Sequence, residues 1–120
     1  MSFAERFENL EIWQQAQELA VQIYSEFGAS SPSARDLRFN SQIQAAAVSI
    51  SNNIAEGFDS GSNPEFARFL RIAKRSCAEV RSMFYLAVRL NYLSSARSGE
   101  LRNDAEVLSK RIAAFTRTLK

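Results

Sequence analysis

Two carboxylates, Glu56 and Glu79, are the side chains that come closest to an acid–base pair in this sequence. Such a pair usually needs a histidine, a metal ligand set or another reactive group beside it. The 120 residues include no histidine and one cysteine, Cys77, so neither the usual zinc sites nor Ser-His and Cys-His nucleophiles can be assembled. We therefore predict a non-enzymatic protein without catalytic residues, metal or cofactor. A small-molecule site built on Glu56 and Glu79 is the alternative.

Lys and Arg are concentrated in the second half of the chain. Residues 1–67 hold three Arg against nine acids, a charge of −6, whereas residues 68–120 hold twelve Lys or Arg against four acids, a charge of +8. Clustered cations attract phosphate and release its counterions. The candidate nucleic-acid-binding residues are Arg68, Arg71, Lys74, Arg75, Arg81, Lys110 and Arg111. Alternatively, the acidic and basic halves neutralise each other within or between subunits.

A polar line runs beside the apolar seam of the segment 34–58. An antiparallel turn near Ser60 and Gly61 would place Gln42 level with Glu79, as a candidate hydrogen-bonded pair between two helices. The same turn would place Ser49 level with Ala73, and Glu56 level with Phe66 near the amide end of the third helix. Small and polar groups at such positions favour close packing and a fixed helix register. We therefore predict a structural role for the residues of this set, which are Gln42, Ser49, Asn53, Glu56, Gly57 and Glu79.

Apolar residues recur at alternating spacings of three and four over approximately residues 9–28, 34–58, 64–92 and 98–119. In the first segment, the predicted buried seam is Leu10, Trp13, Gln17, Ala20, Tyr24 and Phe27, and it is widened by Leu19 and Ile23. Four amphipathic segments joined by short breaks predict an all-α, up-down-up-down antiparallel four-helix bundle, with residues 1–120 as a single domain. No run of about twenty apolar residues is present, so we expect a cytoplasmic protein without membrane contact.

Three polar residues are the predicted helix starts. Ser33, followed by Asp36, suits the start of the second helix, because a hydroxyl group and a nearby acid satisfy the free amide groups there. Asn63 is expected to cap the third helix, with Pro64 in its first turn. Ser98 is expected to start the fourth helix.

The segment Ser49-Ile-Ser-Asn-Asn-Ile-Ala-Glu-Gly57 resembles the central motif of the bacterial 23S rRNA intervening-sequence protein family, usually Ser-Ile-Pro-Ser-Asn-Ile-Ala-Glu-Gly. The resemblance extends over nearly the whole chain, through residues 10–16, 63–73, 76–80 and 91–93. Three departures stand out. Ser51 replaces the frequent proline, Gln44-Ala45 replaces a frequent Arg-Arg pair, and Arg35-Asp-Leu37 replaces Tyr-Gly-Leu.

This resemblance implies a four-helix subunit that assembles as a homopentamer and has no established enzymatic activity. Relatives that serve diversity-generating retroelements bind nucleic acid and a reverse transcriptase. The resemblance therefore implies RNA or DNA, a reverse transcriptase or an RNA-processing protein as partners. A protein-interaction scaffold that binds no nucleic acid is the alternative function.

Several aromatic residues fall outside the simplest single-core seams. They are Phe39, Phe58, Phe69, Tyr85 and Tyr92. Because a bundle of this size has room for only some of them inside, we expect several to line a subunit interface.

Overall fold

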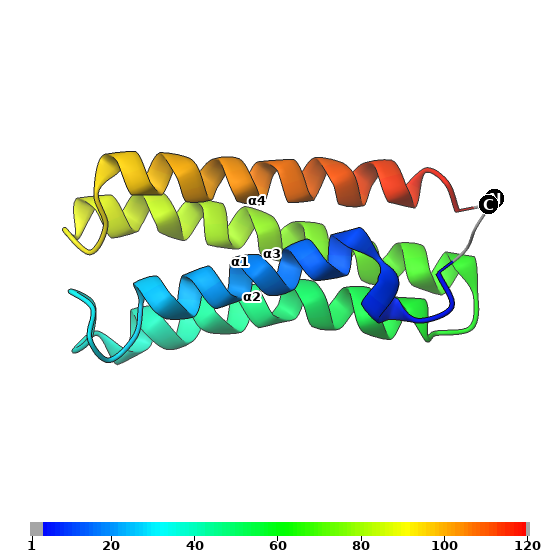
Figure 1. Cartoon of the computed structure of the whole chain (residues 1–120), viewed down its shortest axis with the longest axis horizontal. Coiled ribbons are helices and arrows are strands. Elements are labelled where there is room, and N and C mark those ends of the chain that lie inside the picture. The colour runs from blue at the N-terminus through cyan, green and yellow to red at the C-terminus, as the bar shows by residue number, and fades with distance from the viewer. Residues whose placement is uncertain (1–3, 120) are drawn as a thin grey trace.

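The computed structural model describes residues 4–119, which form four α-helices and one short 3-10 helix (Figure 1). The 3-10 helix η1 spans Phe7–Asn9, and the α-helices are α1 (Glu11–Glu26), α2 (Leu37–Phe58), α3 (Asn63–Arg89) and α4 (Ser95–Thr116). Consecutive helices run in opposite directions and pack side by side along a molecule 45 Å long (Figure 1). The predicted all-α, up-down-up-down four-helix bundle is confirmed. No helix in the described range is apolar over the length needed to cross a bilayer.

Serine and aspartate side chains cap three of the helices, but none of the three predicted capping residues is the one observed. Asp36, rather than Ser33, caps α2 by accepting the Phe39 N–H at 3.0 Å. Ser33 is buried instead and donates a hydrogen bond to Asn40 Oδ1 at 2.7 Å. The chain between α1 and α2 therefore folds back onto α2, which begins three residues later than predicted.

The third and fourth helices, by contrast, begin earlier than predicted. Ser62 caps α3 and Asn63 is already helical, with Pro64 in the first turn as expected. Ser94 caps α4 by accepting the Arg97 N–H. Ser98 is fully buried one turn later, where its hydroxyl donates to Phe84 O at 3.1 Å.

The core is a continuous stripe from each helix. The apolar residues that recur at spacings of three and four are buried in α2 and α3, and in α4 as far as Ile112, whereas Phe115 and Leu119 beyond it are only partly buried. The predicted seam of α1 is correct in part: Leu19, Ile23 and Phe27 are buried, but Gln17 and Tyr24, the latter 48% exposed, are not. The buried residues of α1 are Ile12, Ala16, Leu19 and Ile23. Gln17 faces the neighbouring helix and donates to Ser51 Oγ at 3.0 Å. Ser51 is buried, and α2 continues unbroken through the position where the family motif has proline.

Aromatic rings fill one end of the core. Phe27 packs against Phe39 and Phe84, and Phe39 in turn packs edge-on against Tyr92 with centroids 5.3 Å apart. The Tyr92 hydroxyl donates to Asp36 Oδ2 at 2.6 Å.

Of the five aromatic residues expected to lie off the core, three therefore contribute to it. Phe39 is buried, while Phe58 and Tyr92 are partly buried against the core. Phe69 is half-buried, and Tyr85 alone of the five is exposed.

Candidate nucleic-acid interface

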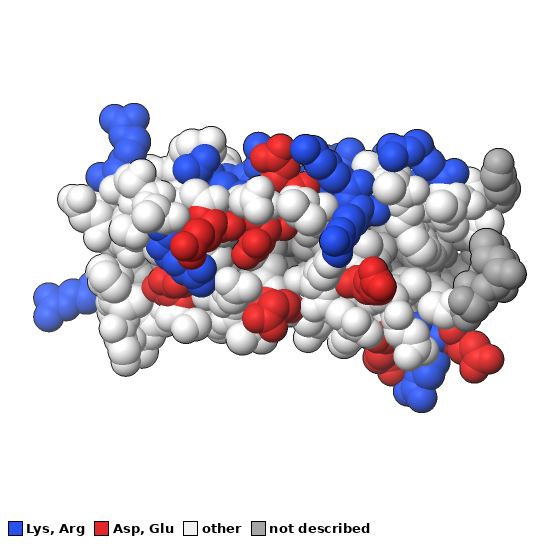
Figure 2. Space-filling model, turned by 45° about the horizontal axis from the view of Figure 1, so that its top comes forward, with Lys and Arg blue, Asp and Glu red and all other residues white. Residues whose placement is uncertain are grey.

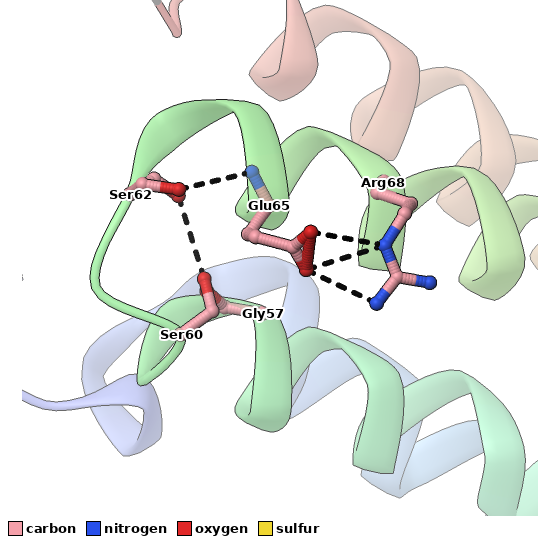
Figure 3. Close-up of polar contacts among 5 residues, drawn as sticks. All are labelled: Gly57, Ser60, Ser62, Glu65 and Arg68. Atoms are coloured by element: carbon pink, nitrogen blue, oxygen red, sulfur yellow. Dashed lines mark hydrogen bonds and ion pairs between the residues drawn. The ribbon is translucent and has the colours of Figure 1, made fainter.

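The turn between α2 and α3 fixes where the basic residues of α3 begin (Figure 3). The Ser60 hydroxyl donates to Gly57 O at 2.6 Å, and Ser62 Oγ accepts the Glu65 N–H at 3.2 Å. One turn into α3, Glu65 accepts hydrogen bonds from both Nε and Nη2 of Arg68. This pairing raises the pKa of Arg68 and lowers the pKa of Glu65. Arg68 is therefore held in an exposed ion pair with Glu65.

Three cations that follow in α3 are exposed and lack a carboxylate partner among the described residues. Arg71, Lys74 and Arg75 form no ion pair or side-chain hydrogen bond there. Together with Arg68 they line a shallow hollow of about 610 Å³ that reaches to Ser109 on α4. Within one turn of each other on an open surface, these cations present the donors and positive charge that bind phosphate.

The other three predicted basic residues, Arg81, Lys110 and Arg111, lie outside this group. Arg81 and Lys110 both lie beside Glu106 of α4, at 3.8 Å and 3.3 Å. Arg111 lies in a different hollow, of about 920 Å³, formed by the N-terminal residues, α1 and α4. Of the seven candidates, the structure brings four together, and three of those four are unpaired.

The distribution of charge over the surface follows the division seen in the sequence. On the face drawn in Figure 2, most Lys and Arg lie along the upper edge, and most Asp and Glu lie across the middle. Arg97 is an exception, because its guanidinium lies beside acidic residues. It donates hydrogen bonds to Glu26 at 2.6 Å and also to Glu100 and Gln22.

The polar line of α2 partly has the structural role predicted for it. Ser76 of α3 donates to Ser49 Oγ at 2.9 Å, and Asn53 donates to both the backbone and the hydroxyl of Ser49. These bonds fix the register of α2 against α3 three residues away from the expected pairing of Ser49 with Ala73.

The predicted hydrogen bond between Gln42 and Glu79 is wrong. Both side chains are exposed, and neither forms a hydrogen bond within residues 4–119. The shift in register is the physical reason, because it moves Glu79 away from the level of Gln42. Glu56 is also exposed and makes no hydrogen bond to the first turn of α3.

No cluster in the described range assembles a reactive or metal-binding set. Groups of three or more His, Cys, Asp or Glu side chains able to hold a metal ion do not occur there. Cys77 lies on the buried side of α3, and this burial raises the pKa of its thiol to about 12. The thiol therefore stays protonated near neutral pH, where only the thiolate is nucleophilic.

Tyr85 and Arg89 are surface residues of α3 that the basic pattern did not include. Tyr85 is 55% exposed, and the guanidinium of Arg102 lies over its ring, 4.1 Å from the centroid. The signal that could have found them is spacing, because Arg71, Arg75, Tyr85 and Arg89 follow one line of alternating three- and four-residue steps.

The family model described as 23S rRNA-intervening sequence protein matches residues 8–114. A solved structure of a protein of unknown function from the S23 ribosomal protein family, from Bacteroides thetaiotaomicron VPI-5482, superposes with a TM-score of 0.81. The two chains are 22% identical, and the match covers 88% of this chain and 95% of the other, so the likeness shows the fold. Comparison with curated proteins gave no match.

Proposed function

Since the chain belongs to the 23S rRNA-intervening sequence protein family, we propose that it is a non-enzymatic, self-assembling bundle that binds RNA or DNA through the exposed face of α3. The family match covers residues 8–114, which include all four α-helices except the last two residues of α4. The likeness indicates no enzymatic family.

The observation that carries the proposal is the set of unpaired cations Arg71, Lys74 and Arg75. A solvated helix surface usually intersperses both signs of charge, and carboxylates elsewhere in this bundle do neutralise Arg68, Arg81, Lys110 and Arg97. These three cations are left without such partners on a shallow surface. A polyanion that follows α3 would supply the missing negative charge and would release its own counterions.

The direct test is a charge reversal with a matched control. Arg71→Glu combined with Arg75→Glu should weaken binding of a single-stranded oligonucleotide and should leave helical content intact, because both side chains are exposed. The slope of log K against log salt should fall by about 1.4, since each lost phosphate contact removes about 0.7 from it. Arg35→Glu combined with Arg38→Glu changes the net charge equally on the acidic half, and should alter binding much less. Wild-type binding that is absent at low salt, or insensitive to salt, contradicts the proposal.

Self-assembly is the second component of the proposal, with a homopentamer as the state that the resemblance implies. Leu86 and Leu90 are apolar residues exposed near the C-terminal end of α3, which supports burial against another molecule. Native mass spectrometry or light scattering at micromolar concentration tests this component. A monomeric mass contradicts it.

A protein-interaction scaffold is the alternative function, and the separation of charge favours it. The acidic surface across the middle of Figure 2 and the basic edge above it are complementary, so two copies could neutralise each other across a contact. An RNA-processing partner with an acidic surface would be bound in the same way. In that case the reversal of Arg71 and Arg75 would dissociate the assembly, and native mass would report the change.

A further inference from the structure

The exposed surface of α3 carries one straight row of residues whose chemistry changes along its length. Steps of four and three residues lead along it, and every member is exposed. The members of this row, which we call the α3 row, are Arg71, Arg75, Ala78, Ser82, Tyr85 and Arg89. Two arginines open the row, small residues occupy its middle, and an aromatic ring followed by an arginine closes it. It includes no acid.

The Tyr85 ring is held in place by Arg102 of α4. The Arg102 guanidinium lies over one face of the ring, and its Nη1 donates to Tyr85 Oη at 2.8 Å. Arg102 is itself anchored, because its Nε donates to Ser98 Oγ at 3.1 Å. Ser98 is fully buried and bonded to Phe84 O at 3.1 Å. A chain of hydrogen bonds thus runs from the interior of the bundle to the ring.

This arrangement leaves an oriented aromatic surface beside solvent. One face of the ring is occupied by Arg102, while 55% of Tyr85 remains exposed. A ring fixed in advance loses little conformational entropy when a flat partner stacks on it. Nucleobases are such partners, and they stack on aromatic side chains when they are unpaired.

We propose that the α3 row is a site for single-stranded nucleic acid, in which Arg71 and Arg75 hold phosphates and Tyr85 stacks an unpaired base. From Arg71 to Tyr85 the helix rises by about 21 Å, so a strand of several nucleotides would follow it over Ala78 and Ser82, where no side chain is long enough to obstruct the backbone. Paired bases keep their faces covered, so a duplex would reach the cations but not the ring. The inference rests on the proposed nucleic-acid binding and adds to it the preference for single strands.

The test separates stacking from charge. The probe is a single-stranded oligonucleotide of about 12 nucleotides, titrated by fluorescence anisotropy over a series of salt concentrations. Tyr85→Ala should lower the affinity about 10-fold at every salt concentration and leave the slope of log K against log salt unchanged, because a base stack contributes no counterion release. Tyr85→Phe keeps the ring and should bind within a few-fold of wild type. Tyr24→Ala, at a tyrosine 48% exposed on α1, is the matched control and should bind as wild type does.

Two further probes complete the experiment. An abasic strand with the same number of phosphates should bind wild type and Tyr85→Ala equally, and a duplex of the same length should be insensitive to Tyr85→Ala. If all strands bind with a salt slope but Tyr85→Ala has wild-type affinity, stacking is overturned while the proposed function stands. If wild type binds no strand, both fail. If Tyr85→Ala changes the native mass and not the intrinsic affinity, Tyr85 belongs to a subunit contact and the inference is overturned.

Discussion

Gly57 of α2 and Phe66 of α3 lie so close together that a Cβ atom at position 57 would be 2.8 Å from Cδ1 of the Phe66 ring. The same atom would be 2.8 Å from Cβ of Phe69 and 3.3 Å from the Phe66 carbonyl oxygen. A ring can rotate, but a Cβ atom and a carbonyl group move only with their backbone. The glycine of the central motif therefore sets the distance between α2 and α3 at this end of the bundle.

Gly57→Ala should destabilise the protein by about 1–3 kcal/mol, the usual cost of overpacking, although alanine favours helix by about 1 kcal/mol relative to glycine. Gly99→Ala is the control in α4, because its added Cβ would meet only Arg102 Nη2 at 3.8 Å. That change should stabilise the protein by up to about 1 kcal/mol. Urea unfolding of both variants measures the difference, and equal stabilities would rule out the steric explanation.

Asn91 follows α3 with a φ of 62°, in the left-handed region that favours glycine and tolerates asparagine. The next residue, Tyr92, closes the helix by donating its N–H to Ala87 O at 2.8 Å. Asn91→Gly should therefore keep or slightly raise the free energy of unfolding, whereas Asn91→Ala should lower it by about 1 kcal/mol. Thermal unfolding followed by circular dichroism compares the two. An alanine variant as stable as the glycine variant would contradict the left-handed conformation.

The hydrogen bond from Tyr92 makes stability depend on pH through Asp36. The Tyr92 hydroxyl, the Phe39 N–H and the charge of Arg38 lower the pKa of Asp36 below its ordinary value of 3.8. A carboxyl group whose pKa is lower in the folded state stabilises the fold above its unfolded pKa, and this contribution is lost as pH falls through the lowered pKa.

Asp36→Asn keeps a capping side chain but removes the titration. The difference in the free energy of unfolding between wild type and this variant should therefore shrink as pH is lowered from about 6 to about 2.5. Asp104→Asn, at an exposed residue of α4, controls for the loss of one negative charge. A difference between wild type and Asp36→Asn that stays constant over this range would show that Asp36 does not contribute through its charge.

Cys77 provides a probe of global opening. Its pKa of about 12 leaves on the order of 1000-fold less thiolate at pH 8 than an ordinary cysteine has. Labelling by an aromatic disulfide reagent should thus be at least that much slower in native buffer than in strong denaturant. Labelling of the native protein at the rate of the unfolded chain would contradict the burial of Cys77.

The fold could be predicted from the sequence because, in three of the four helices, only one face is apolar enough to be buried. In α2, for example, Ile43, Ile50 and Ile54 leave no other stripe to bury. The first helix is different, since Ile12 precedes Trp13 and Ile23 precedes Tyr24. Adjacent apolar residues allow either of two helix faces to be buried, and contacts with the other helices decide which one is.

Helix starts and hydrogen-bond partners could not be predicted in the same way. Ser33 and Ser98 are good capping residues by type, but each finds a buried partner through tertiary folding, Asn40 for the first and Phe84 O for the second. For the candidate interface, the sequence gives the cations of α3 but not their pairing. Only the register of α4 against α3 places Glu106 beside Arg81 and leaves Arg75 unpaired.

The four helices are not equally bound to one another. α2 packs closely against α3 and α3 against α4, whereas α1 packs mainly on α2 and only lightly on α4. Arg97 and its partners Glu26 and Gln22 are polar links across that last contact. The molecule is thus a closely packed unit of α2, α3 and α4, against which α1 packs less extensively. Amide hydrogens of α1 should exchange with solvent through partial openings that leave α2, α3 and α4 protected.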